Sequence, residues 1–170
     1  MSSATIEERV IVPERAADHL DRLYGLAVSL CGSRHLAEDV VQEAYARLLS
    51  RPRRMRGSDE FPYLARIVRN VLNDHHRRSR RIELTEPPCE EDVPDTRDDT
   101  DPEAAIRTRE LYALIADLPA AQRDAIAAVD VAGMSYRQAA DALGVPDGTV
   151  MSRLARGRAR LARTLADDWE

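Results

Sequence analysis

The segment that most constrains the fold is the stretch 135–163, SYRQAADALGVPDGTVMSRLARGRARLAR, which has the pattern of a helix-turn-helix. Ser135 is a suitable N-cap for a short first helix, and Gly144 stands where the chain must turn with positive φ. Pro146 and Asp147 then favour the start of a second helix. Helical spacing predicts inward-facing residues at Ala139, Ala140 and Leu143 on the first helix, and at Val150, Leu154, Gly157 and Leu161 on the second.

The outward face of the second helix is basic. Between residues 150 and 165 the sequence holds five arginines and no acidic residue. A solvated surface helix is the alternative, but such a helix usually carries acidic partners at i±4. A helix without negative charge that follows a tight turn fits the major groove of DNA. The outward residues are Thr149, Ser152, Arg153, Arg156, Arg160 and Arg163.

Charge is segregated along the chain. The 170 residues carry a formal net charge of −5, and all 25 basic residues are arginine. The stretch 51–81 holds ten arginines and three acidic residues, whereas 83–103 holds ten acidic residues and only Arg97. Residues 83–102 also contain four prolines and almost nothing apolar, which predicts a flexible, self-repelling linker.

Helical periodicity dominates the remainder, and strands are essentially absent from the pattern. We therefore expect an all-α fold of two small helical domains joined by the acidic linker. The expected parts are an N-terminal tail 1–13, a first domain 14–82, the linker 83–102 and a second domain 103–166. Helices are expected at about 14–31, 34–50, 58–81, 102–117 and 119–133 ahead of the helix-turn-helix. The inward residues expected in the first two are Leu20, Leu23, Leu26, Ala27 and Leu30, and Leu36, Val40, Ala44 and Leu48.

Several classes of protein are excluded by what the sequence lacks. It has no apolar run of 18 residues and no signal-peptide pattern at its N-terminus, so we expect a cytoplasmic protein without membrane insertion. Cys31 and Cys89 have no metal-ligand spacing, and His75 and His76 are adjacent and so cannot share a metal. Phosphate-loop and nucleophile motifs are missing. We expect no catalytic site, no metal and no other cofactor.

Two helices carry polar faces of different character. On the helix 34–50, one face holds Asp39, Gln42, Glu43 and Ala46 with Glu38 beside it; such a face is usually solvated, and partner docking is the alternative. On the helix 58–81 the polar face holds Arg66, Arg69, Asn70, Asn73 and Arg77. Phe61 and Tyr63 begin that helix, and aromatic rings beside arginines are typical of single-stranded DNA binding. A core position is favoured for Phe61, and both interpretations stay open for Tyr63.

These segments in this order resemble a known family. The order is AEDVVQEAYARLL, then YLARIVRNVLNDHHRR, then the acidic linker, then LPAAQRDAIAAVDVAGMSYRQAADALGVPDGTVMSRLARGRARL. Over about residues 15–165 the chain resembles an extracytoplasmic-function (ECF, group IV) RNA polymerase sigma factor of the sigma-70 family. The resemblance implies a non-enzymatic factor that binds core RNA polymerase and directs promoter-specific transcription initiation. It implies a sigma2-like domain that reads the −10 element and a sigma4-like helix-turn-helix that reads the −35 element.

The resemblance also implies roles for residues and partners. The partners are the β and β′ subunits of core polymerase, duplex −35 DNA, melted −10 DNA and an anti-sigma factor, and the linker follows the RNA path. The loop 55–57 contacts the non-template strand, and Asn70 lies near the pocket for a flipped −10 base. Polymerase docking is implied for Glu38, Asp39, Gln42 and Glu43; −10 contact for Arg56, Tyr63, Arg66, Asn70, Asn73, Asp74 and Arg77; and −35 contact for Thr149, Met151, Ser152, Arg153 and Arg156.

Two residues depart from the family pattern, and other functions compete. Tyr63 stands where the family commonly has Trp, and Met151 stands where it commonly has Lys or Arg. One rival is a free-standing helix-turn-helix regulator that dimerises on a palindrome, for which the second basic helix would be superfluous. Another is a small metal-dependent nuclease that uses the linker acids, and a third is an adaptor that has lost promoter function.

Overall fold

The computed structural model describes residues 8–10, 16–50, 54–56, 60–82 and 102–167. We call the part up to residue 82 the N-terminal half and the part from residue 102 the C-terminal half. The expected linker lies almost wholly outside the described residues. No helix in the described ranges has both the length and the apolar character needed to cross a membrane.

The N-terminal half contains α2 (Leu20–Cys31), α3 (Arg34–Ser50) and α4 (Phe61–Ile82). The described chain also contains a short two-stranded sheet that the sequence pattern did not predict. In it β1 (Glu8–Val10) pairs antiparallel with β2 (Arg54–Arg56), with Glu8 opposite Arg56. The bounds of α3 agree with the helix expected at 34–50.

The core of this half follows the predicted apolar spacing with two corrections. Leu23, Val40 and Val68 are all almost completely buried. Leu20, expected inward, is 47% exposed because α2 begins at this residue and Ala16, in the turn before it, fills the inward position. Leu36 is only half-buried, since the next residue, Ala37, faces the core.

The C-terminal half contains α5 (Pro102–Ala116), α6 (Ala120–Ile126), α7 (Tyr136–Leu143) and α8 (Asp147–Asp167). A π-helical turn, η1 (Ala127–Val131), continues α6 within the range expected to be a single helix. The helix-turn-helix is confirmed: Ser135 caps α7 in a capping box with Gln138, and Gly144 turns the chain with φ 68°.

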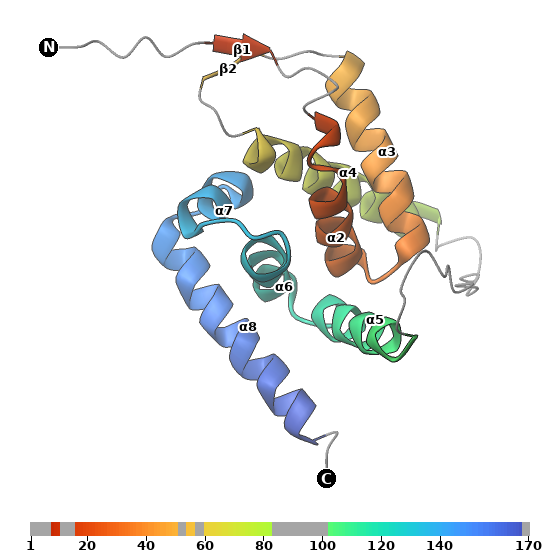
Figure 1. Ribbon diagram of the computed structural model, residues 1–170, viewed down its shortest axis with the longest axis vertical. Helices are drawn as coiled ribbons and strands as arrows, with labels where there is room; N and C mark the ends of the chain where they lie inside the picture. Colours follow the sequence, from red (N-terminus) through yellow and green to blue (C-terminus); the bar gives the residue numbers. More distant parts are fainter. Residues whose placement is uncertain (1–7, 11–15, 51–53, 57–59, 83–101, 168–170) are drawn as a thin grey trace, which may run out of the picture.

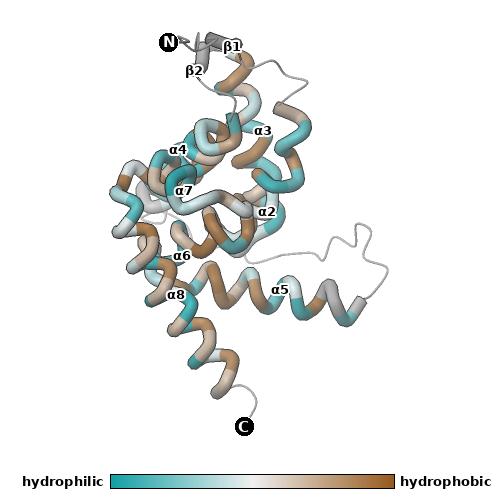
Figure 2. The backbone as a smooth tube through the Cα atoms, turned by 60° about the vertical axis from the view of Figure 1, so that its left-hand side comes forward, coloured by the Kyte–Doolittle hydropathy of each residue, from teal (hydrophilic) through white to brown (hydrophobic). Residues whose placement is uncertain are grey.

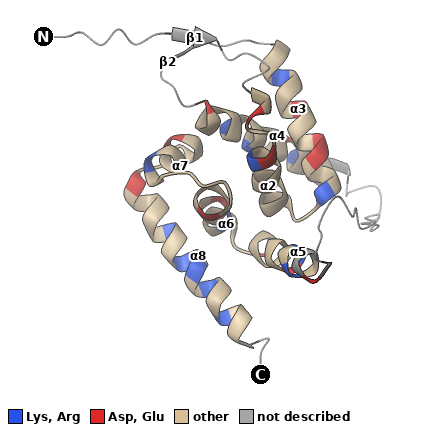
Figure 3. Cartoon of the chain, in the orientation of Figure 1, with Lys and Arg blue, Asp and Glu red and all other residues tan. Residues whose placement is uncertain are grey.

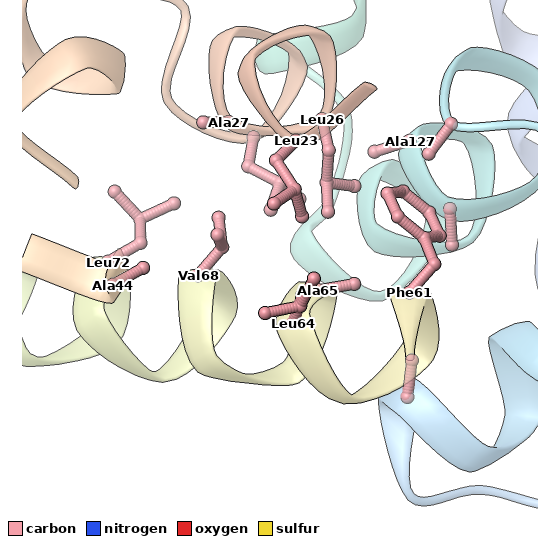
Figure 4. Packing of buried hydrophobic residues seen from close by; sticks show 14 of the residues in the cluster. Leu23, Leu26, Ala27, Ala44, Phe61, Leu64, Ala65, Val68, Leu72 and Ala127 are labelled. Atoms are coloured by element: carbon pink, nitrogen blue, oxygen red, sulfur yellow. The ribbon is translucent and has the colours of Figure 1, made fainter. Parts of the chain in front are cut away.

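The two halves lie side by side (Figure 1), and buried residues of both belong to one hydrophobic cluster. α2 packs against α5 and η1, and α7 packs against α4. Figure 4 shows Phe61 and Leu26 of the N-terminal half beside Ala127 of the C-terminal half. The prediction of two small helical domains is confirmed, but the contact between them could not be predicted, because each apolar face could equally have been completed within its own half.

Glycine allows the halves to approach closely where α2 ends. Gly32 has φ 73°, and its N–H donates to the carbonyl of Val28 at 2.7 Å, which ends α2. A Cβ atom at this position would lie 2.9 Å from Cβ of Ala116 in α5. Gly32 therefore combines a left-handed backbone with a close approach between α2 and α5.

Candidate nucleic-acid interface

The exposed face of α8 carries the residues expected to contact duplex DNA. Met151 is 52% exposed, Ser152 and Arg156 are exposed, and Thr149 and Arg153 are half-buried. On the opposite side, the buried Val150 and Leu154 hold the helix in place, and a Cβ at Gly157 would lie 3.0 Å from Ile126. Figure 2 shows the alternation of hydrophilic and hydrophobic residues along α8 that fixes which face is outward.

Arginines follow one another along α8, as Figure 3 shows. One of them has an acidic partner that the sequence argument overlooked: Nε of Arg158 donates to Oδ2 of Asp130 in η1 at 3.0 Å. Asp130 is 28 residues away, so a search for acidic residues at i±4 on the same helix cannot find this pair. This ion pair raises the pKa of Arg158 above its ordinary value and anchors η1 to the side of α8.

A second polar face lies on α4. Arg66, Asn70, Asn73 and Arg77 are exposed along it. Tyr63 is half-buried, and the guanidinium of Arg66 lies 5.4 Å from the centre of its ring. The guanidinium over this ring is a cation–π contact, and it places an aromatic ring at the start of a basic helix face, where a base could stack on it.

Phe61 belongs to the core, as the sequence favoured. It is only 1% exposed, and the Arg22 guanidinium lies 3.8 Å from the centre of its ring. The His19 ring lies against it with 5.4 Å between the ring centres. Of the two aromatic residues at the start of α4, Tyr63 is therefore the one accessible for stacking on a base.

Asp74 and Glu43 lie in a charged cluster between α3 and α4. Arg47 donates to Oε1 of Glu43 at 2.6 Å and to Oδ2 of Asp74 at 3.0 Å. His75 Nε2 lies 2.9 Å from the other carboxylate oxygen of Glu43. Burial raises the pKa of Glu43, but the hydrogen bonds from Arg47 and His75 outweigh burial and hold this pKa below its ordinary value.

The expected docking face of α3 is therefore divided. Asp39 and Gln42 are exposed, and Glu38 is half-buried beside them. Glu43 turns toward α4 and is occupied by Arg47 and His75. The structure thus presents two acidic or amide side chains fully outward, with a third partly covered, and uses Glu43 to join α3 to α4.

The helical spacing predicts that Arg69 shares the polar face with Asn70, but its side chain is directed to the other half. Its Nε donates to Oδ2 of Asp124 in α6 at 2.9 Å. Nothing in the local sequence announces this pair, because Asp124 lies 55 residues further along the chain. Arg56, expected at the −10 DNA, lies in β2, and its neighbour Gly57 lies outside the described residues.

The described part of the chain has no group of three or more His, Cys, Asp or Glu residues arranged to hold a metal ion. Cys31 is half-buried, and its thiol donates to the carbonyl of Ser33 at 3.1 Å. Cys89 lies outside the described residues.

Comparisons with known proteins match each half of the chain to a different protein family model. Residues 16–82 match the family described as Sigma-70 region 2, and residues 108–161 match Sigma-70, region 4. The ECF RNA polymerase sigma factor SigE of Mycolicibacterium smegmatis is 35% identical over 158 residues, which are 90% of this chain and 61% of SigE. This chain thus spans less than two thirds of the length of that relative. SigM of Mycobacterium tuberculosis H37Rv is 36% identical over 154 residues, covering 86% of this chain and 73% of SigM.

Solved structures share the fold. The sigma factor RpoE of Bartonella quintana, crystallised with the anti-sigma factor NepR, superposes with a TM-score of 0.70 at 26% identity, covering 91% of this chain and 98% of that chain. CnrH, solved with the cytosolic domain of CnrY, superposes with a TM-score of 0.65 at 21% identity, covering 91% of this chain and 87% of that chain.

Proposed function

Since this chain belongs to the ECF RNA polymerase sigma factors of the sigma-70 family, we propose that it acts as a group IV member that binds core RNA polymerase and directs promoter-specific initiation. The observation that carries the proposal is the presence of two exposed polar helix faces, one on each half. The face on α4 lies in the region 2 match, and the face on α8 lies in the region 4 match.

The −35 element is read as duplex DNA by α8. Arg153 and Arg156 supply guanidinium groups that can form paired hydrogen bonds with guanine or clamp a phosphate. Thr149 and Ser152 add short hydroxyl contacts at the start of the helix. Met151 is 52% exposed and stands where the family commonly has a charged residue. It can instead make an apolar contact with the methyl group of a thymine.

The −10 element is read as melted DNA by α4. An unstacked base is held near Asn70, whose amide can donate and accept hydrogen bonds on a base edge. Tyr63 stacks on a neighbouring base, a contact worth about 1–3 kcal/mol per base. Arg66, Asn73 and Arg77 continue this surface along the strand, and we assign a further −10 contact to Arg56 of β2. Asp74 contributes indirectly, because it orients Arg47.

Polymerase docking falls to α3. Asp39 and Gln42 are exposed and bind the β′ subunit, with Glu38 at the edge of the contact. Glu43 holds α3 against α4, so docking and −10 recognition are carried by one rigid pair of helices. The C-terminal half engages the β subunit. The protein acts in the cytoplasm, catalyses no reaction of its own and needs no cofactor.

An anti-sigma factor completes the proposed set of partners. The RpoE of Bartonella quintana that shares this fold was solved in complex with the anti-sigma factor NepR. This chain exposes polar helix faces on both halves, so a protein that covers them would keep it from the polymerase.

The test mixes the purified chain with bacterial core RNA polymerase and genomic DNA and maps the transcript starts. We expect starts that share a −35 and a −10 motif and are absent without the chain. Discrete duplex binding by the chain alone, without association with core polymerase, would instead support a free-standing regulator.

Two variants separate the proposed surfaces. Asn70→Ala should retain polymerase binding and lose −10 discrimination. Asp39→Ala, exposed on α3, should weaken polymerase binding without changing which −10 sequences are used. If Asn70→Ala also failed to bind core polymerase, the two faces would be wrongly assigned.

A further inference from the structure

Arg69 lies at the contact between the halves, on the same helix as the proposed −10 surface. Its Nε donates to Oδ2 of Asp124 at 2.9 Å, and its Nη1 donates to the carbonyl of Leu143 at 3.4 Å. The Arg69 side chain is 31% exposed and that of Asp124 is 13% exposed, so solvent weakens this pair less than a surface pair. Both residues line a small cavity between the halves together with Leu26, Ala65, Ala128 and Leu143.

A second arginine makes a similar contact at another point. Arg22 of α2 donates from Nε and Nη2 to the carbonyl of Ala132 at 3.1 and 2.8 Å, while its guanidinium covers Phe61. Ala132 follows η1, so this contact also joins the two halves. We call the arrangement in which the two halves are in contact closed. It is held at α2 by the hydrogen bonds from Arg22 to an uncharged carbonyl, and at α4 by the ion pair between Arg69 and Asp124.

The closed arrangement is too short to reach both promoter elements at once. The −10 and −35 elements are named for their positions upstream of the transcription start, so they are about 25 base pairs apart. At a rise of 3.4 Å per base pair this separation is roughly 85 Å. A compact chain of this length has a radius of gyration of about 15 Å, so it spans roughly half that distance. Because α7 lies directly against α4 (Figure 1), the halves must separate before α4 and α8 can occupy the two elements together.

We propose that Arg69 is a latch with two alternative partners: Asp124 in the closed chain and a promoter phosphate in the open one. The proposal rests on the proposed function. Arg69 directly precedes Asn70 and lies one turn from Arg66 and Asn73, so opening adds a guanidinium to the −10 surface. Carboxylate and phosphate offer a guanidinium the same paired acceptor geometry.

The two partners compete for one side chain, and this competition couples opening to DNA binding. While Asp124 holds Arg69, the −10 surface lacks one positive charge and the halves stay together. When DNA takes Arg69, the closed arrangement loses its ion pair, so DNA favours the open chain by its differential affinity for the two arrangements.

The latch is tested first without polymerase, by X-ray scattering of the full chain. Asp124→Arg places two guanidinium groups face to face, and we expect the radius of gyration to rise by roughly a third from about 15 Å. The double variant Arg69→Asp/Asp124→Arg restores an opposite-charge pair and should return the radius to the wild-type value. Asp130→Arg is the matched control, because its partner Arg158 lies in the same half.

Circular dichroism separates opening from unfolding, since an opened chain keeps its helical signal. A radius that stays at the wild-type value in Asp124→Arg, with the helical signal retained, would overturn the latch. So would a double variant that remains expanded.

The DNA contact is tested with the reconstituted holoenzyme on a promoter mapped from its own transcript starts. Arg69→Gln and Asp124→Asn both break the pair, but only Arg69→Gln removes the proposed phosphate contact. We expect Arg69→Gln to bind promoter about tenfold more weakly than Asp124→Asn, with a slope of log affinity against log salt that is lower by about one. Equal affinities and slopes for the two variants would overturn the DNA role.

The two experiments fail separately. A holoenzyme that starts at no promoter would count against the proposed function, whereas the scattering cycle would still decide whether Arg69 and Asp124 form the latch. A closed wild-type chain whose variants behave alike in scattering would remove the latch while leaving promoter recognition intact.

Discussion

At the scale of single residues, Glu43 shows how one carboxylate joins two helices that carry candidate site residues. It accepts hydrogen bonds from Arg47 on its own helix, and its other oxygen lies 2.9 Å from His75 on α4. Since Arg47 also binds Asp74 and Arg78 lies 3.9 Å from Oε1 of Glu43, five charged or titratable side chains form one cluster. This cluster fixes the angle at which the exposed face of α3 stands relative to the exposed face of α4.

We predict that Glu43→Gln lowers the free energy of unfolding by about 1 kcal/mol at pH 7, because charge-assisted hydrogen bonds are lost at a partly exposed site. The pKa of Glu43 is depressed in the folded chain, so its contribution is complete above the ordinary value of 4.5 and is lost as the pH falls through the folded value. Urea unfolding of both proteins from pH 7 down to pH 3 measures the difference, which should shrink below about pH 4.5. Asp39→Asn, exposed on the same helix, is the matched control and should change little. A gap between Glu43→Gln and wild type that stayed constant with pH would contradict the role of the charge.

We predict that Gly32→Ala destabilises the chain by about 1–3 kcal/mol. Alanine is strained at φ 73°, and its Cβ would lie 2.9 Å from Cβ of Ala116. Gly148→Ala, in the first turn of α8 and with nothing within 4 Å of the added Cβ, is the control. Urea unfolding should show the control to be neutral or slightly stabilised. Equal stabilities for the two variants would mean that Gly32 is not constrained as described.

At the scale of elements, the capping box of α7 controls where the helix-turn-helix begins. Ser135 Oγ accepts from the N–H of Gln138 at 3.3 Å, and the N–H of Ser135 donates to Oε1 of Gln138 at 2.7 Å. We predict that Ser135→Ala costs about 1 kcal/mol of stability and increases amide exchange in the first turn of α7. Ser50→Ala, at the exposed end of α3, serves as the control. Unchanged exchange in α7 would show that the cap is dispensable.

The elements that local chemistry specifies are those that the sequence predicted. α3 begins after Ser33, whose Oγ accepts from the N–H of Leu36. This contact and the apolar spacing both lie within the segment itself, so the bounds of α3 could be predicted. The turn at Gly144 and the cap at Ser135 are likewise local. Among the candidate site residues, the exposure of Asn70 and of Arg156 followed from helical spacing alone.

The parts that the sequence did not predict depend on distant partners. β1 has only three residues and exists through pairing with β2, more than 40 positions away. The π-helical turn η1 is stabilised where Ala132, just after it, accepts from Arg22. Glu43 and Arg69 both carry charges that look solvated on a helical projection. Their partners, His75 and Asp124, are brought to them only by tertiary packing.

At the scale of the whole molecule, the shared core couples the stability of the two halves. Leu26, Phe61 and Val68 of the N-terminal half belong to one buried cluster with Ala127 of the C-terminal half (Figure 4). Leu143 belongs to the same cluster. Unfolding either half alone would expose the apolar surface that the other half buries against it. The coupling must be finite if the halves are to separate, as we propose, while each stays folded.

We therefore predict that the wild-type chain melts in a single calorimetric transition, with a van't Hoff enthalpy close to the calorimetric enthalpy. We expect Asp124→Arg to separate the halves and so remove the coupling. Its transition should then broaden or split, and the ratio of the van't Hoff enthalpy to the calorimetric enthalpy should fall below one. Arg69→Asp/Asp124→Arg, which restores the ion pair across the contact, should recover the single transition. Two well-resolved transitions in the wild-type chain would contradict a shared core, because halves that unfold independently cannot be burying substantial apolar surface against each other.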